Sequence, residues 1–582
     1  MTTWELPGGY GRVKPDIIAA GEHVLGPRAG GNFGQCSGLS GTSVASPVIA
    51  GAAALLASTV PENRRSDIVN PASIKQVLTE SARRVQGAGV FEQGAGALNL
   101  VGAFELLGRY TPRATFLPPS LDLTDPYMWP FSRQPLYYGA MPTLFNVTIA
   151  NGMGVTGYIT GLTWKEEDQP GAATGSGRDV LKLEADFPDV LWPWSGYLAV
   201  ALRVSDSRRD FEGIVRGTLE VVIESEAGTG EVQPRTTTAI LPITASVIET
   251  PPRHRRLLWD QFHNVPYPPA YVPRDYLGDD SDMLDKLGDH PHTNFRTLFG
   301  KLLDAGYYME ILGSDWTQFN AEDYGALLLV DPEAGMGDAE KEKLVRDVKE
   351  RGLSLVVFAD WYSEDAMSQV NFVDDNTRMM WTPVTGGCNV PALNSLLLPA
   401  FGMALGGTAV DGVFSLAGRE VHLASGNAIS RMPPGGVVVT APSLEGVFVK
   451  GSKAAESKGV AVHKDLAVIG ALDTNTLREG GSASLEGIGG RVFLFGDSSC
   501  ADDAALDLLK GTGRNGGSGG GGDCLWLFKS AVRYACEGFE DPRVFGDARP
   551  VPAESNGMFD KRGAGGFSDG LPVPISSSPT KE

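Results

Sequence analysis

The chain has 582 residues, of which 49 are basic and 70 are acidic, so its formal net charge is −21. This acidic balance argues against binding to nucleic acid or to anionic membrane surfaces, and the length predicts several globular domains. No run approaches the roughly 18 apolar residues of a transmembrane helix, and the first residues lack the basic and apolar regions of a signal peptide.

The first segment, residues 1–108, predicts mixed α/β structure. Residues 13–18 (VKPDII) predict a short strand, and a glycine-rich loop follows at residues 26–35. Residues 42–57 are small and apolar on nearly every side, which predicts a buried helix.

Two further helices are predicted in the same segment. Asn70 and Pro71 carry the signals of a helix start, and the next residues form an amphipathic pattern with Ile74, Val77 and Leu78 on one face. Glycines near residue 95 then predict a tight turn before a short helix.

The second segment, residues 109–250, predicts an antiparallel β-sandwich. Four stretches alternate between apolar and polar residues, and turn-rich stretches separate them. One of them contains the sequon Asn146-Val147-Thr148, which makes Asn146 a candidate glycosylation site if the protein enters the secretory pathway.

The third segment, residues 251–545, alternates buried apolar strands with amphipathic helices, which predicts a largely parallel α/β sheet. Beyond it, residues 546–582 are rich in Pro, Gly and Ser and are expected to be disordered. The predicted fold class is therefore multidomain, with α/β and all-β parts.

The five cysteines are too few for a dense disulfide framework. Cys500 and Cys524 flank a glycine-rich insert and are a candidate disulfide pair. The other three, Cys36, Cys388 and Cys536, are expected to be single thiols.

Residues 38–47 (GLSGTSVASP) carry a candidate nucleophile. Gly41 permits a tight turn and the close approach of a substrate backbone, and Ser43 falls in the first turn of the apolar helix. The free N–H groups and partial positive charge of a helix N-terminus suit a developing oxyanion. The alternative is an ordinary core helix with Thr42 or Ser43 as its N-cap.

Three stretches in this order, KPDIIAAG, GTSVASPVIAGAAALL and GAGALNL, resemble the C-terminal part of the catalytic domain of subtilisin-like serine proteases, the subtilases. In this resemblance Ser43 matches the nucleophile of the family. Four further stretches, TTWELPGGYGRVKPDI, YMWPF, NGMGVTG and LLWDQFHNVPYPP, resemble membrane-anchored subtilases of the secretory pathway. This resemblance runs from Met1 to about Tyr534. It implies protein substrates that are membrane-bound precursors, a Golgi location and luminal partners for the accessory domains. No cofactor is expected in this chain, although calcium binding is possible in full-length members of the family.

The base that would activate Ser43 is not evident. In subtilases the triad aspartate and histidine precede the serine, and only 42 residues precede Ser43 here. His23 is expected to be an exposed loop residue. The remaining histidines fall in the third segment: His254, His263, His290, His292, His422 and His463. We therefore expect an N-terminally truncated chain that is inactive as a protease on its own.

Two other nucleophile-like motifs lie in the third segment. The sequence around Ser498 (FGDSS) is similar to an esterase motif, but no histidine follows His463. We therefore expect a strand end here, with Asp497 and Ser498 capping the segment that follows. The sequence around Cys388 (TGGCNVP) is similar to the cysteine elbow of glutamine amidotransferases. Val390 replaces the second glycine of that elbow, which favours a degenerate, non-catalytic domain of this type.

Asp289, His290 and His292 lie close together in GDHPHTNF and are a conceivable metal site. The alternative, which we favour, is that Asp289 and Thr293 cap the following helix, so that no metal is bound.

These patterns together predict a serine endopeptidase that acts through an acyl-enzyme at Ser43. The alternative is a non-catalytic binding or scaffold protein that retains a vestigial protease segment.

Overall fold

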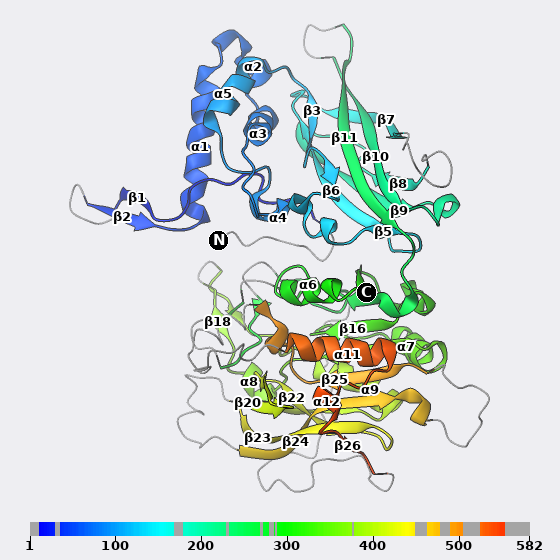
Figure 1. Ribbon diagram of the computed structural model, residues 1–582. Helices are drawn as coiled ribbons and strands as arrows, with labels where there is room; N and C mark the ends of the chain where they lie inside the picture. The colour runs from blue at the N-terminus through cyan, green and yellow to red at the C-terminus, as the bar shows by residue number, and fades with distance from the viewer. Residues whose placement is uncertain are drawn as a thin grey trace. The chain divides into compact units, whose positions relative to one another are not determined.

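The computed structural model forms two compact units, Met1–Thr250 and Pro251–Glu582, each of which is described here by itself (Figure 1). The structure describes residues 11–28, 35–167, 179–227, 232–267, 272–278, 284–285, 288–374, 377–447, 462–477, 489–503 and 524–552. The glycine-rich insert near residue 517 and residues 553–582 of the expected tail lie outside these ranges.

The first part of unit 1 is a hairpin followed by helices. Strands β1 (Val24–Pro27) and β2 (Cys36–Leu39) pair antiparallel, and β2 leads into the long helix α1 (Thr42–Thr59). The helices that follow are α2 (Arg65–Ile68), α3 (Pro71–Glu80), α4 (Val90–Gln93) and α5 (Leu100–Gly108).

Helix α3 begins where its capping residues predict. The side chain of Asn70 accepts a hydrogen bond from the N–H of Ser73, the hydroxyl of Ser73 accepts one from the N–H of Asn70, and Pro71 occupies the first helical position. Its buried face includes Val77 and Leu78, whereas Ile74 is only half-buried.

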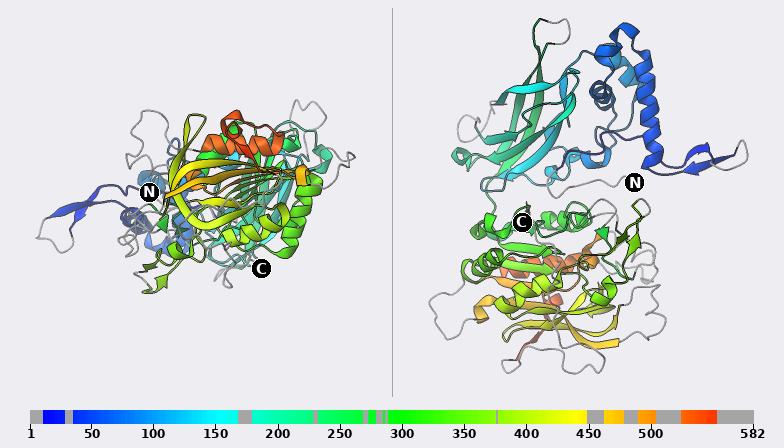
Figure 2. Two further views of the ribbon diagram at one scale, coloured as in Figure 1. Left: turned by 90° about the horizontal axis from the view of Figure 1, so that it is seen from below. Right: turned by 180° about the vertical axis from the view of Figure 1, so that it is seen from behind.

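Helix α1 differs from the expectation of a buried helix. Ala52 and Leu56 are its only buried residues. It packs against α3 and α5 on one side, as both views of unit 1 show (Figure 1, Figure 2), and the rest of its surface is exposed or half-buried. By length and composition α1 could also span a membrane, contrary to the expectation from the sequence, but the core helix of a soluble protein has the same properties.

The second part of unit 1 is a β-sandwich, as the alternating pattern predicts. One sheet has the order β3 (Ala114–Leu117), β6 (Thr143–Asn151), β9 (Trp194–Val204) and β8 (Leu181–Asp186), all antiparallel. The other has the order β4 (Leu121–Asp122), β11 (Arg235–Ile248), β10 (Gly213–Ser225) and β7 (Gly157–Glu166), and β5 (Leu136–Tyr137) also pairs with β11. Inward residues such as Val200, Leu219 and Leu241 are fully buried in one core.

Gln76 ties α3 to the sandwich. Its side-chain amide donates hydrogen bonds of 2.9 Å to the carbonyl oxygens of Arg113 and Ala150, and its Oε1 accepts one from the hydroxyl of Tyr110. Gln76 is buried, and this polar contact joins the helical part to the sandwich within unit 1.

Unit 2 is built on a mixed sheet. Five strands are parallel, in the order β15 (Tyr308–Leu312), β12 (Arg256–Asp260), β16 (Ala326–Val330), β17 (Ser354–Phe358) and β25 (Arg491–Phe495). Antiparallel strands continue it: β24 (Val462–Asp473), β23 (Val437–Gly446), β20 (Ala404–Leu416) and β21 (Arg419–Leu423). The expectation of a largely parallel sheet therefore holds for only one half.

Short strands and helices complete unit 2. Strands β22 (Asn427–Arg431) and β26 (Arg549–Pro550) pair with β20 and β23, so residues 549–550 of the expected tail are part of the sheet. Two small ladders pair β13 (Val272–Pro273) with β14 (Leu284–Asp285) and β18 (Phe372–Val373) with β19 (Met380–Trp381). The described helices are α6 (Arg296–Asp304), α7 (Asp338–Arg351), α8 (Glu364–Met367), α9 (Val390–Phe401), α11 (Leu525–Glu537) and α12 (Pro542–Phe545).

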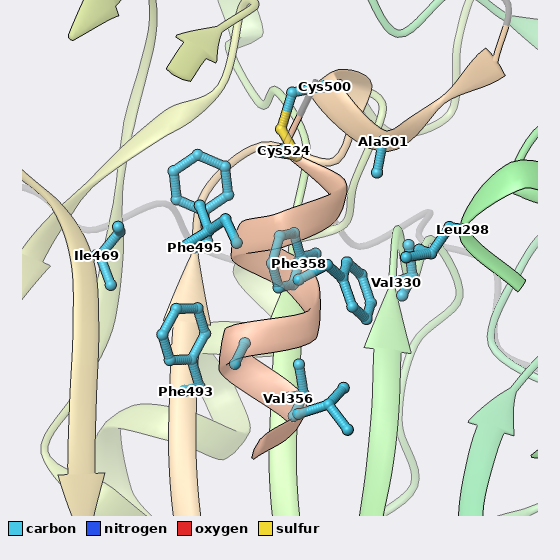
Figure 3. Close-up of a cluster of buried hydrophobic side chains, with 14 of the residues drawn as sticks. Leu298, Val330, Val356, Phe358, Ile469, Phe493, Phe495, Cys500, Ala501 and Cys524 are labelled. Carbon is cyan, nitrogen blue, oxygen red and sulfur yellow. A yellow bond between two sulfur atoms is a disulfide. The ribbon is translucent and has the colours of Figure 1, made fainter. Parts of the chain in front are cut away.

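The core of unit 2 lies where α11 packs on the parallel strands. The ring of Phe358 on β17 stacks on that of Phe528 on α11, with centroids 4.1 Å apart. Figure 3 shows Phe493 and Phe495 of β25 beside Phe358, with a disulfide at the end of the same cluster. These strands are buried on both faces, which explains their continuous apolar sequences.

Candidate functional site

Ser43 lies in the first turn of α1 and is exposed. Gly41 precedes the helix with a φ of 153°, and its carbonyl oxygen accepts hydrogen bonds from the N–H groups of Val44 and Ala45. Within the described ranges, the Ser43 hydroxyl and the N–H groups of Thr42 and Ser43 have no hydrogen-bond partner. Neither Thr42 nor Ser43 serves as a side-chain cap, so the N-cap alternative fails and the helix end is open to a ligand.

Glycines fit this turn closely against the preceding segment. The N–H of Gly41 donates to the carbonyl oxygen of Gly21 at 2.8 Å. A Cβ at Gly21 would lie 2.9 Å from the oxygen of Gly41 and 3.1 Å from the Cβ of Ala45. The position of Ser43 therefore depends on a residue without a side chain at 21.

The expected strand at residues 13–18 contributes only a bridge from Ile18 to Ala97. The bridge is flanked by hydrogen bonds from Ile18 to Gly96 and from Leu98 to Ile18. A Cβ at Gly94 would lie 2.0 Å from the carbonyl oxygen of Pro15, so glycine at 94 permits the approach of the two segments.

Asp16 is held in the same region by two lysines. It pairs with Lys14, and its Oδ1 lies 3.2 Å from the Nζ of Lys75. Burial would raise the pKa of Asp16, but the two ammonium groups lower that pKa below its usual value. Asp16 is thus an ionised anchor for α3, not a partner of Ser43.

His23 does not act as a base in this arrangement. It is exposed, with a φ of 49°, and its backbone N–H donates a 2.9 Å hydrogen bond to the hydroxyl of Ser40. It is the one histidine in residues 1–250, and no contact of its imidazole with Ser43 is found among the described residues.

Ser498 and Cys388 are both fully buried in unit 2. The hydroxyl of Ser498 is hydrogen-bonded to Asp331 and Asp360, and Asp497 accepts bonds from the N–H groups of Ser499 and Ala424. Asp497 therefore caps the short segment that follows the strand, as expected, whereas the side chain of Ser498 makes no capping hydrogen bond.

Burial raises the pKa of the Cys388 thiol well above its usual value, and nearby Asp331 raises it further. Its Sγ lies 3.4 Å from the carbonyl oxygen of Pro332. Cys388 is an inert thiol in these surroundings.

The region of Asp289 differs from the expected helix cap. Helix α6 begins only at Arg296, and the N–H of Thr297 in its first turn is capped by Asp503, which is distant in sequence. The Thr293 hydroxyl instead donates to the carbonyl oxygen of Gly288 at 2.6 Å.

The two histidines of this region are buried and neutral. Burial lowers the pKa of His290 to about 3 and that of His292 well below its usual value. Asp289 belongs to a group of side chains with metal-ligand spacing, but neither His290 nor His292 does among the described residues.

The remaining predicted site residues lie far from Ser43 in sequence. Cys500 and Cys524 form a disulfide, while Cys36, Cys388 and Cys536 are free. Asn146 lies within β6, paired on one side with Ala199 of β9, and its Oδ1 is buried. Glycosylation of Asn146 stays a prediction.

Sequence reasoning missed a cluster of buried carboxylates in unit 2: Asp275, Asp289, Asp331, Asp360 and Asp502. Burial raises the pKa of Asp289 and of Asp360 to about 7. A signal was present, because Asp331 and Asp360 come directly after the apolar strands LLLV and VVFA. Polar residues that follow parallel strands meet at one edge of a sheet.

Three parts of the chain match known protein families. Residues 3–96 match the subtilase family, residues 117–250 match the domain described as "MBTPS1, third Ig-like domain", and residues 251–549 match "MBTPS1, fourth GATase-like domain". The chain belongs to the site-1 protease group of the subtilase family.

The relatives extend this similarity over nearly the whole chain. The chain is 44% identical over 551 residues to the subtilisin-like protease SBT6.1 of Arabidopsis thaliana, an alignment of 94% of this chain and 49% of the relative. It is 45% identical over 549 residues to the membrane-bound transcription factor site-1 protease of Rattus norvegicus, covering 94% and 48%. The corresponding protein of Homo sapiens is 44% identical over 547 residues, with the same coverage. The chain thus spans about half the length of these relatives.

Proposed function

We propose that this member of the site-1 protease group supplies the nucleophile of a serine endopeptidase. The observation that carries the proposal is the geometry of Ser43, which is exposed at the open N-terminus of α1 with an unengaged hydroxyl among the described residues. A structural serine in a helix cap would instead hold a backbone N–H.

The chemistry follows from this position. The Oγ of Ser43 attacks the carbonyl carbon of a peptide, and its proton passes to a base and then to the leaving amine. The backbone N–H of Ser43 and the positive end of α1 stabilise the oxyanion. Water then attacks the ester of the acyl-enzyme and releases the acid, while the base takes a proton from the water and returns it to Ser43.

The base comes from polypeptide outside the described residues, because His23 makes no contact with Ser43. Exposed apolar side chains in the same part of the chain are compatible with such an addition: Leu25 and Leu39 of the hairpin that leads into α1 are 76% and 59% exposed.

The proposed substrates are membrane-bound precursor proteins in the secretory pathway, with a location in the Golgi. Two observations support these substrates and this location. The names of the rat and human relatives specify membrane-bound transcription factors. The disulfide between Cys500 and Cys524 is of a kind typical of oxidising compartments. The Ig-like and GATase-like domains would present surfaces to luminal partners.

A chimera tests the proposal. The part of the human relative that precedes the matched region is joined to this chain, and cleavage of a membrane-bound transcription factor reporter is measured in cells that lack their own site-1 protease. We expect cleavage, and we expect Ser43→Ala to reduce it by about 10³-fold or more. Ser46→Ala, in the same turn and also exposed, is the matched control and leaves cleavage unchanged. Equal cleavage by the Ser43→Ala and Ser46→Ala chimeras would overturn the assignment.

The second candidate is a non-catalytic scaffold protein. It is favoured by one observation, the lack of a base beside Ser43 among the residues that the structure describes. A folded, secreted chimera that cleaves no reporter would support it.

A further inference from the structure

The buried carboxylates of unit 2 lie at the carboxyl ends of its parallel strands. Asp331 directly follows β16, and Asp360 follows β17 by one intervening residue. Asp275, Asp331 and Asp360 each place one carboxylate oxygen within 4.8 Å of the oxygens of the other two. All three residues are at most 4% exposed.

A second group of the same kind shares one residue with the first. Asp275, Asp289 and Asp502 also have carboxylate oxygens within 4.8 Å of one another. Because Asp275 belongs to both groups, the five residues form one connected acidic cluster: Asp275, Asp289, Asp331, Asp360 and Asp502.

Within this cluster, Asp331 is only partly satisfied by the hydrogen bonds among the described residues. The Ser498 hydroxyl lies against Oδ2 of both Asp331 and Asp360, but it has one proton and donates to only one of them at a time. Oδ1 of Asp331 is fully buried and has no hydrogen-bond partner among the residues that the structure describes. An unpaired carboxylate oxygen in a protein interior is costly, which indicates that a positive ligand belongs beside it.

The carboxylates of the cluster are held in place by neighbouring residues. A Cβ at Gly387 would lie 2.9 Å from Oδ1 of Asp360, so only glycine lets the backbone approach there. The side-chain amide of Asn294 donates to Asp289 at 2.8 Å and to Asp502 at 2.7 Å. Asp502 lies two residues after Cys500, whose disulfide to Cys524 anchors its loop to the start of α11 at the end of the core shown in Figure 3. A set of ligands held in this way is preorganised for an ion.

We propose that Asp275, Asp331 and Asp360 bind one hard divalent cation, Ca²⁺ in preference to Mg²⁺, with Asp289 and Asp502 completing the negative surroundings. Oxygens bound to one Ca²⁺ at about 2.3–2.6 Å lie within about 5 Å of one another, as these do. All donors are carboxylate oxygens, which favours a hard cation over zinc or copper, and several carboxylates from separate loops suit Ca²⁺ better than the strictly octahedral Mg²⁺. This site is separate from Ser43 and does not depend on the proposed protease function.

Arg274 is the rival source of positive charge, because it is buried and adjacent to Asp275 in sequence. If its guanidinium neutralised the cluster, the protein would need no ion. The two possibilities differ in whether stability depends on added cation.

The test uses the full 582-residue chain, produced with its disulfide and stripped of metal with a chelator. Thermal unfolding and calorimetric titration are measured with CaCl₂ and, separately, with MgCl₂. We expect saturable binding of one Ca²⁺, a rise in Tm and at least 10-fold weaker binding of Mg²⁺. Tb³⁺ is a second probe, because its luminescence should be sensitised by Trp361, the residue after Asp360.

The variants Asp331→Asn and Asp360→Asn should each weaken Ca²⁺ binding by at least 10-fold. Both should remain folded without metal, because each replacement keeps the shape and removes a repelling charge. Glu342→Gln on the exposed face of α7 is the matched control and leaves binding unchanged. A wild-type chain that binds no Ca²⁺ at millimolar concentration would overturn the proposal and assign the neutralising role to Arg274. Ca²⁺ binding that survives both Asp replacements would also overturn it, because the ion would then bind at another site.

Discussion

Gly21 lies directly against Gly41, the residue that starts the helix of Ser43. The carbonyl oxygen of Gly21 accepts a 2.8 Å hydrogen bond from the N–H of Gly41, and no space remains for a side chain between the two backbones. The direction in which α1 presents Ser43 is therefore set by a contact 22 residues earlier in the chain.

Replacing Gly21 with alanine should destabilise unit 1 by about 1–3 kcal/mol, because the new Cβ would meet the oxygen of Gly41 at 2.9 Å. The control is Gly51→Ala in α1, where a Cβ has nothing within 4 Å and should be neutral or stabilise the helix by up to about 1 kcal/mol. Urea unfolding of the two variants measures the difference. Equal urea midpoints for the two variants would show that a side chain at position 21 can be accommodated.

Gln76→Ala should also destabilise unit 1, by about 2–3 kcal/mol. The replacement removes both hydrogen bonds that join α3 to the sandwich and leaves the buried Tyr110 hydroxyl without its acceptor. Glu105→Gln on the exposed side of α5 is the control. If the Gln76→Ala variant has the same urea midpoint as the control, the polar contact does not stabilise the association of α3 with the sandwich.

Much of the fold could be predicted where a local signal decides the structure. Asn70 and Pro71 mark the start of α3, and Gly352 ends α7 with a left-handed φ of 68°. Alternation alone predicts the long strands of the sandwich. In each case the deciding residues lie within a few positions of the element that they specify.

The exposure of α1 could not be predicted in this way, because burial of an apolar helix depends on what packs against it and not on its own residues. The antiparallel half of the unit 2 sheet was missed for a different reason. Strands β20 and β21 are joined by Ala417 and Gly418, both with positive φ, and alanine is not a usual residue in such a turn. The acidic cluster was not predicted from the sequence, because its residues come from distant loops that only the parallel sheet brings together.

Loss of the Cys500–Cys524 disulfide should destabilise unit 2. The bond closes a loop with a sequence separation of 24 residues, for which loop-closure entropy predicts about 3 kcal/mol. The double variant Cys500→Ser/Cys524→Ser should therefore unfold at lower urea, and reductant should lower the midpoint of the wild-type chain but not that of the variant. If the double variant has the same urea midpoint as the wild-type chain, the disulfide does not contribute to the stability of unit 2.

Stability should also depend on pH through His263. Burial would lower the pKa of His263, but Asp260 at 2.7 Å and Glu340 at 3.4 Å raise it to about 9. Because the folded pKa lies above the usual value of about 6.5, the ion pair stabilises the fold fully below about pH 6.5 and loses this effect as the pH rises through about 9.

The expected loss across that window is about 2–3 kcal/mol. Urea unfolding at pH 6 and pH 9.5, compared with His263→Gln, isolates the contribution. The variant should be less stable at pH 6 and should lose less stability between the two pH values than the wild-type chain. A variant with the wild-type pH dependence would rule out His263 as its source.

Reaction with a fluorophosphonate probe, followed by peptide mapping, tests the central claim most directly: Ser43 is a nucleophile whose base is not among the described residues. We predict that the 582-residue chain is not labelled at Ser43, and that the active chimera with the human relative is labelled there and loses the label with Ser43→Ala. Rapid labelling of Ser43 in the 582-residue chain itself would contradict the claim, because a base within this chain would then be activating the serine.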